Sequence, residues 1–212
     1  MTALRQSRVV LIHGLAGSPR WWAPLLPYVS GYEVTYVDPR DELTAEPDDV
    51  LVGHSLGGFR AAQLAALQPV KKLVLVAPVG LQRAAPWRLL GSTSLAFAPT
   101  AALDSLRWGP RAMLRYGLEA MTAHVDASTI RAPTLIVWGE HDHLVPVRLA
   151  ADWQTVIPDS RVAIIGGARH VPMVDAPSAF AEVLLDFLRD DAGSGVVDGV
   201  RLAGDGDEPA GR

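Results

Sequence analysis

The stretch Val50-Leu51-Val52-Gly53-His54-Ser55-Leu56-Gly57-Gly58 decides how this chain is interpreted. An apolar, β-branched run enters a Gly-x-Ser-x-Gly sequence, and a helical pattern follows over Phe59–Leu67. Glycines are needed on both sides of the serine where a strand turns into a helix so tightly that side chains have no room. Such a turn lifts the hydroxyl above the sheet and aims the next helix N-terminus at it, which stabilises developing negative charge. A glycine-rich turn with a helix-capping serine is the alternative, but the flanking strand and helix favour a nucleophile at Ser55.

A serine hydroxyl is a weak nucleophile, and it needs a histidine base that a carboxylate orients. Asp142 follows the predicted strand Thr134–Trp138, and His170 follows the predicted strand Arg161–Ile165. Open α/β sheets place their sites at the carboxyl ends of strands. We therefore expect Ser55, Asp142 and His170 to form a catalytic triad.

Six short apolar runs recur along the chain, and most are followed by a helical pattern. Runs that are continuously apolar indicate strands covered on both faces, as in a parallel sheet. The alternation predicts an α/β fold with a doubly wound, mostly parallel sheet and helices on both sides. The predicted strands are Arg8–Ile12, Glu33–Val37, Val50–Val52, Lys72–Val76, Thr134–Trp138 and Arg161–Ile165, and the predicted helices are Trp21–Val29, Phe59–Leu67, Arg148–Val156 and Ala179–Leu188.

Two stretches interrupt this rhythm. Residues 80–131 separate two predicted strands by far more than an ordinary βα connection, and they carry helical patterns. We expect them to form a helical cap inserted into a single domain that spans residues 1–189. Residues 190–212 are rich in glycine and aspartate with little to bury, which predicts a disordered acidic tail.

With these motifs in place, the chain resembles the α/β-hydrolase superfamily, in its serine esterase and lipase-like branch, from Arg8 to about Arg189. The family's chain order of nucleophile, acid and base matches Ser55, Asp142 and His170. The segment His13–Ser18, after the first predicted strand, is similar to the family's oxyanion loop. The resemblance implies that the backbone N–H groups of Leu15 and Leu56 bind the oxyanion.

The chain departs from this family in two ways. It starts directly on what looks like the family's third strand, so the leading hairpin is expected to be missing. Only about a dozen residues, Asp38–Asp49, join the second predicted strand to the nucleophile strand, which leaves little room for the usual crossover helix. An apolar face left uncovered there favours a partner, so a homodimer is one expectation.

Composition excludes several other classes of protein. The net charge is −4, which argues against a nucleic-acid partner, because phosphate binding needs a concentrated basic face. No apolar run approaches the length of a membrane helix, and the N-terminus shows no signal-peptide core. Cysteine is absent, so disulfides and thiolate sites are excluded. A cytoplasmic protein with no nucleic-acid or membrane partner is expected.

Other titratable residues compete for a role. Glu140 is the nearest rival acid, and Asp104 in the cap is the next. Adjacent side chains in His141–His143 diverge and no third ligand motif accompanies them, so no metal and no cofactor are expected. Packing or hydrogen bonding is expected for His54 and His13, a surface or core position for His124, and a helix cap near Pro177 for Asp175.

The expected activity is acyl transfer to water through an acyl-enzyme, with a carboxylic ester or thioester as substrate. The apolar and aromatic cap suggests a hydrophobic acyl or aryl group beneath it, with Trp108, Met113 and Val145 as candidate substrate contacts. The same side chains could equally form the cap's own core. Two alternatives stay open: a carbon–carbon bond hydrolase or cofactor-free lyase with the same three residues, and a non-catalytic ligand-binding protein.

Overall fold

The computed structural model describes residues 7–81, 98–122, 124–190 and 200–202. Its centre is one parallel sheet with strand order β2-β1-β3-β4-β5-β6-β7. The strands are β1 (Arg8–Ile12), β2 (Glu33–Val37), β3 (Val50–His54), β4 (Lys72–Val76), β5 (Thr134–Gly139), β6 (Ser160–Ile165) and β7 (Val200–Leu202). The six strands predicted from the sequence are confirmed, and their observed ends agree to within two residues.

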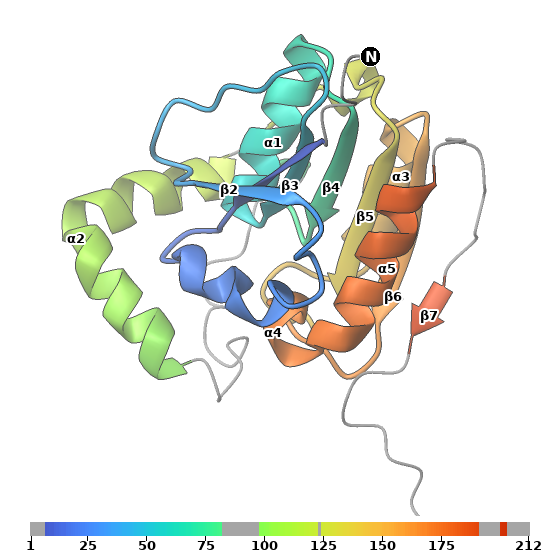
Figure 1. Ribbon diagram of the computed structural model, residues 1–212. Coiled ribbons are helices and arrows are strands. Elements are labelled where there is room, and N and C mark those ends of the chain that lie inside the picture. The colour runs from blue at the N-terminus through green and yellow to red at the C-terminus, as the bar shows by residue number, and fades with distance from the viewer. Residues whose placement is uncertain (1–6, 82–97, 123, 191–199, 203–212) are drawn as a thin grey trace, which may run out of the picture.

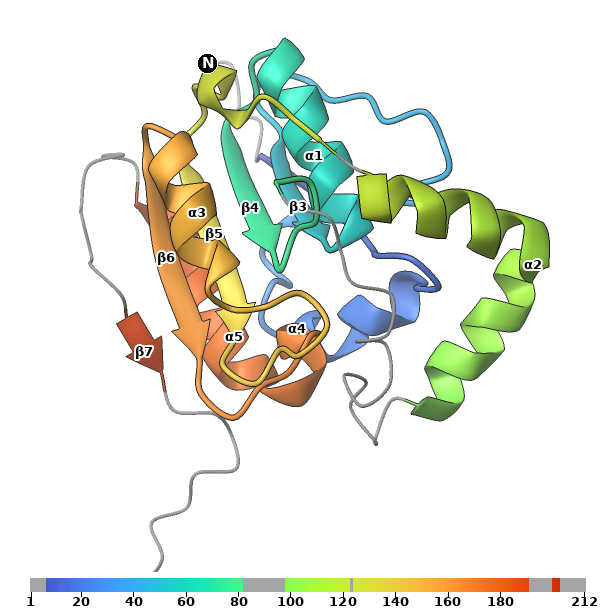
Figure 2. The ribbon, with the colours of Figure 1, turned by 180° about the vertical axis from the view of Figure 1, so that it is seen from behind.

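Helices cover both faces of the sheet (Figures 1 and 2). One face carries α1 (Leu56–Leu67) and α3 (Leu149–Val156), and the other carries η1 (Pro19–Leu25), α4 (Pro172–Asp175) and α5 (Pro177–Arg189). Alternate residues of each strand point into the two cores: Leu73 and Leu75 enter the first, and Val74 and Val76 the second. The doubly wound fold is therefore confirmed.

The helix expected over Trp21–Val29 is shorter and of a different kind. The chain forms a 3-10 helix over Pro19–Leu25, with Pro24 inside it. Pro24 and Pro27 lack the N–H groups that an α-helix would need at these positions, so the apolar periodicity there was misleading.

The connection from β2 to β3 contains no helix, as its length predicted. Asp49, at its end, accepts hydrogen bonds from the Arg8 side chain at 3.0 and 2.5 Å and from the Glu46 N–H at 2.7 Å. These bonds fix the loop against the start of β1, in place of helix packing.

Within the expected cap, residues 98–122 form two helical segments that meet at Gly109 and are together labelled α2 (Ala98–Thr122), and η3 (Ala127–Thr129) follows. Gly109, at φ 73° and ψ 160°, and Pro110 bend α2, which stands out beside the sheet (Figures 1 and 2). Trp87 and Phe97, two aromatic residues in the stretch expected to form the cap, lie outside the described residues.

The C-terminal stretch differs in part from the expected tail. Val200–Leu202 pair with Ala163–Ile165 as β7, so the expected disorder is wrong for these three residues, while residues 191–199 and 203–212 lie outside the described chain. In the part that the structure describes, no helix combines the length and apolar character needed to span a bilayer.

Candidate active site

Ser55 lies on a strained turn between β3 and α1. Its φ of 52° and ψ of −114° fall where L-residues rarely lie, and such conformations cluster at functional sites. A Cβ on Gly53 would collide with the backbone of Gly57, and one on Gly57 would collide with the backbone carbonyl of Ile12. The two glycines of the motif are therefore required by close approach of backbone to backbone. The serine is 8% exposed.

His170 and Asp142 form a direct side-chain pair. The imidazole Nδ1 lies 2.7 Å from Asp142 Oδ2, and both residues are buried. The second carboxylate oxygen, Oδ1, accepts the backbone N–H groups of Leu144 at 2.9 Å and Val145 at 3.0 Å. Both carboxylate oxygens of Asp142 therefore have partners: Oδ1 is bound by the loop, and Oδ2 faces the imidazole ring. Because Nδ1 faces Asp142, Nε2 is the ring nitrogen of His170 that is available to accept a proton.

The loops that carry this pair are packed against each other. The His141 N–H donates to the Ala168 carbonyl at 2.8 Å, and a Cβ on Gly139 would lie 2.7 Å from that same carbonyl oxygen. Asp175 accepts the Arg169 N–H at 2.8 Å. The expectation that Asp175 caps the next helix is therefore wrong: α5 has no side-chain cap, and Asp175 instead fixes the backbone beside His170.

His54 is hydrogen-bonded to the backbone of His170, a contact that the sequence did not reveal. Its Nε2–H donates to the His170 carbonyl at 2.8 Å, and the two rings lie 4.8 Å apart. Burial, followed by the charge of His170, holds the pKa of His54 well below its ordinary value. His54 is therefore neutral at pH 7. No local motif marks this contact, because it joins residues 116 positions apart.

His13 is a second buried, neutral histidine. Its Nδ1–H donates to the Gly14 carbonyl at 3.0 Å, and burial lowers its pKa. Asp38 Oδ2 lies 3.7 Å from Nε2, but a neutral ring forms no ion pair with it. His13 thus serves packing and hydrogen bonding, as the sequence suggested.

These two depressed pKa values predict a loss of stability in mild acid. In the unfolded chain a histidine takes up its proton near pH 6.5, while folded His13 and His54 take it up only at lower pH. The unfolded state then binds more protons, so the free energy of unfolding is unaffected above about pH 6.5 and decreases below it, by up to about 1.4 kcal/mol per pH unit for each histidine.

Denaturant unfolding at pH 7.5, 6.5 and 5.5 measures this slope. His54→Gln should make the slope shallower, whereas His143→Gln, at an exposed position, should leave it unchanged. Equal slopes in the wild type and His54→Gln would contradict the prediction for His54.

The loop after β1 lies directly against Ser55. A Cβ on Gly14 would lie 3.0 Å from the Ser55 Cβ and 2.9 Å from His54 Nδ1. The Gly17 N–H donates to the Gly14 carbonyl at 3.1 Å and closes a turn in which Ala16 has φ 56°. Leu56 is the first residue of α1, where N–H groups have no acceptor within the helix. Leu15 and Leu56 therefore belong to the two backbone segments that flank the serine.

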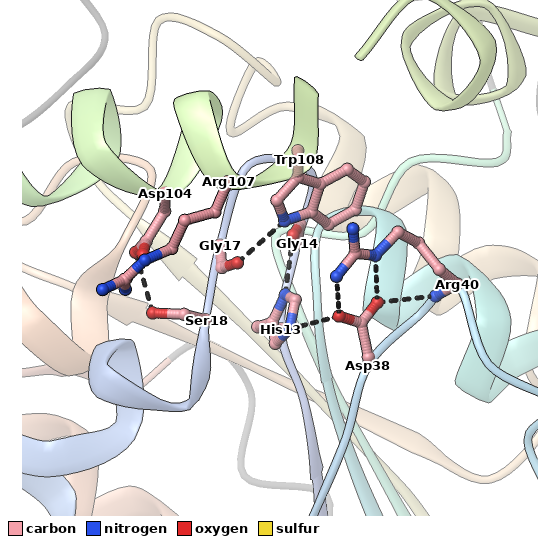
Figure 3. A network of polar contacts seen from close by, with 9 residues as sticks. All are labelled: His13, Gly14, Gly17, Ser18, Asp38, Arg40, Asp104, Arg107 and Trp108. Atoms are coloured by element: carbon pink, nitrogen blue, oxygen red, sulfur yellow. Dashed lines mark hydrogen bonds and ion pairs between the residues drawn. The ribbon is translucent and has the colours of Figure 1, made fainter. Parts of the chain in front are cut away.

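On the far side of this loop, polar contacts join it to α2 and to the loop after β2 (Figure 3). Trp108 Nε1 donates to the Gly17 carbonyl at 3.0 Å, and Ser18 Oγ donates to Asp104 Oδ2 at 2.7 Å. The Arg40 guanidinium lies 4.4 Å from the Trp108 ring centre. It also donates to Asp38 at 2.8 and 2.5 Å. Burial raises the pKa of Asp38, but the side-chain and backbone hydrogen bonds from Arg40 and the nearby positive charges together lower it below its ordinary value.

The rival residues are held elsewhere. Glu140 Oε2 accepts the Gly167 N–H at 3.2 Å, and Asp104 is bound by Ser18 and Arg107. His124 is exposed. Among the described residues, no group of three or more His, Asp or Glu side chains could hold a metal ion.

The three expected substrate contacts differ in their surroundings. Trp108 is buried, and its one polar atom is bound to Gly17. Val145 is also buried; its N–H binds Asp142, and its carbonyl accepts Trp138 Nε1 at 2.8 Å. Met113 is partly exposed and packs on the core that contains α1. Of the three, Met113 has the side chain best able to meet a ligand.

Comparison with known proteins shows the family of this chain. The model of the alpha/beta hydrolase family matches residues 9–183, and the chain belongs to that family. It is 30% identical, over 85% of its length and 98% of the relative, to a pimeloyl-[acyl-carrier protein] methyl ester esterase of Aromatoleum aromaticum. It is 25% identical, over 85% of its length and 90% of the relative, to a putative carbamate hydrolase, RutD, of Escherichia coli.

Solved structures share the fold. MenH from S. aureus superimposes with a TM-score of 0.72 at 17% identity, covering 88% of this chain and 95% of that one. A serine hydrolase of carbazole degradation, the CarC enzyme, gives a TM-score of 0.65 at 21% identity, covering 86% and 90%.

Proposed function

We propose that this chain is a serine hydrolase that cleaves a carboxylic ester or thioester through an acyl-enzyme. The observation that carries the proposal is the 2.7 Å pair of His170 and Asp142, on loops that follow adjacent parallel strands. Ser55 lies on the strained turn after another strand of the same sheet. The family is one of hydrolases, and relatives named as methyl ester esterases support an esterase-type enzyme.

The proposed chemistry follows from the atoms available. His170 Nε2 takes the proton of the Ser55 hydroxyl as the serine oxygen attacks the carbonyl carbon. The carbonyl oxygen becomes an oxyanion, which the N–H groups of Leu15 and Leu56 bind. The protonated ring, stabilised by Asp142, gives its proton to the leaving alcohol or thiol. Water then attacks the acyl-enzyme, with His170 again taking and returning the proton, and the carboxylic acid and free Ser55 are released.

The substrate proposal is an ester with a hydrophobic acyl or aryl group. Apolar side chains of α2 and of the loop before α3 pack on the core beside the serine turn, among them Met113 and Leu144. Such surroundings favour an apolar acyl or aryl group over a charged or sugar-bearing one.

A fluorophosphonate probe followed by an ester panel tests this function. The probe should label Ser55, as peptide mass spectrometry would show, and Ser55→Ala should stay unlabelled. Esters and thioesters of two- to ten-carbon acids should then be hydrolysed with a preference among chain lengths. Labelling of Ser55 without hydrolysis of any ester would instead favour the carbon–carbon hydrolase or lyase. Absence of labelling would favour a ligand-binding protein.

A further inference from the structure

Helix α2 places two buried polar side chains on the loop after β1. Asp104 is 1% exposed and accepts the Ser18 hydroxyl at 2.7 Å, and Trp108 is 6% exposed and donates to the Gly17 carbonyl at 3.0 Å (Figure 3). Burial of a carboxylate is costly without partners, so the charge-assisted bond to Ser18 holds the helix and the loop together. Ser18 precedes η1 but makes no capping bond to it with its side chain.

The bound loop is the one that approaches the serine. Gly17 closes the turn that starts at Gly14, and Gly14 abuts the Cβ of Ser55. The second half of α2 approaches the same turn: a Cβ added to Gly117 would lie 3.9 Å from Leu15 Cδ2. The turn is therefore bonded to α2 before its bend, through Trp108, and lies near α2 after the bend.

Trp108 is itself held in place on several sides. Its ring meets His13 edge-on at 6.1 Å and Tyr116 edge-on at 5.7 Å between centroids, and Arg40 covers a face at 4.4 Å. A side chain so enclosed has little surface left for a substrate. These contacts therefore account for the position of the Trp108 side chain without a substrate.

We propose that Trp108 and Asp104 are positioning residues that set the oxyanion loop, so that the docking of α2 determines the placement of the Leu15 N–H. This inference rests on the proposed function. An oxyanion donor acts only where it lies within hydrogen-bond distance of the developing charge, and displacement by about 1 Å can cost about a hundredfold in rate. Releasing Gly17 or Ser18 would loosen the turn that carries this donor.

Trp108→Phe is the decisive variant, because it removes the indole N–H and keeps an aromatic ring. We expect kcat to fall by at least about tenfold. The loss should be smaller than the hundred- to thousandfold loss that is typical when an oxyanion donor is deleted. KM should stay within about twofold of wild type for short and long acyl esters alike, since ground-state contacts are untouched. The rate of fluorophosphonate labelling at Ser55 should fall in parallel with kcat.

A second pair of variants examines the other contact. Ser18→Ala should lower kcat, and Ser18→Thr, which keeps the hydroxyl, should restore it. Leu106→Ala is the matched control on the same helix, since Leu106 is 78% exposed, and it should leave kcat, KM and labelling rate unchanged.

The outcomes separate this inference from the proposed function. If wild type hydrolyses esters and Trp108→Phe keeps its kcat, or raises KM increasingly with acyl length, Trp108 is a bystander or a substrate contact and the inference is overturned. If Trp108→Phe fails to fold, equal activity of Ser18→Ala and Ser18→Thr overturns it. If wild type is neither labelled nor active, the proposed function itself has failed.

Discussion

Ser55→Ala should abolish turnover, lowering kcat by about 10³- to 10⁶-fold while KM changes little. The reason is chemical: without the hydroxyl no acyl-enzyme forms, and His170 and Asp142 have no nucleophile to activate. The residual rate would come from binding and the oxyanion donors alone. Initial rates on the best ester of the panel measure the effect. Retention of more than a tenth of the wild-type rate would remove Ser55 from the mechanism.

Two controls separate loss of chemistry from loss of structure. Ser128→Ala, at an exposed serine in η3, should be fully active. Ser55→Gly should be inactive but more stable than wild type, by about 1 kcal/mol, because glycine accepts the positive φ of this position without strain. We expect Ser55→Ala to be inactive with an unchanged melting temperature, and Ser55→Gly to melt at a higher temperature. Together these results would show that the strained backbone at this turn is retained because activity requires a serine there.

The strand pattern was predictable because it is local. Each parallel strand reads as a continuous apolar run, and both cores draw on alternate residues of the same runs. The serine turn was predictable for the same reason, because Gly53 and Gly57 are required within a few residues of Ser55. Where local signals conflict, as with Pro24 inside an apolar periodic segment, the prediction of an α-helix was wrong.

Contacts between distant residues carried no such signal. The bond from His54 to the His170 carbonyl spans 116 positions, and the bond from Trp108 to the Gly17 carbonyl spans 91. Both acceptors are backbone carbonyl groups. Every residue has one, so the residue types at these positions do not predict the hydrogen bonds. Only the tertiary structure shows the bond from Trp108 to Gly17, on which our proposal of a positioning role for Trp108 rests.

The environment of the proposed acid makes its replacement unusually informative. Asp142 Oδ1 receives two backbone N–H groups, from Leu144 and Val145, so this position must be an acceptor. In Asp142→Asn the amide oxygen should therefore occupy it, and the amide NH₂ should face His170. An NH₂ group can only donate there, so the ring would present a bare Nδ1 and carry its proton on Nε2. That tautomer cannot accept the serine proton.

Asp142→Asn should accordingly keep the fold and lower kcat by about 10³- to 10⁴-fold, the loss expected of a wrong tautomer. Glu140→Gln, two residues away, is the matched control. Its carboxylate accepts the Gly167 N–H, and an amide oxygen can replace it there, so the loss should be less than about tenfold. Both variants are compared by kcat on one ester and by melting temperature. A severe loss in Glu140→Gln with a mild one in Asp142→Asn would make Glu140 the acid. Mild losses in both would mean that a group other than these two carboxylates orients His170.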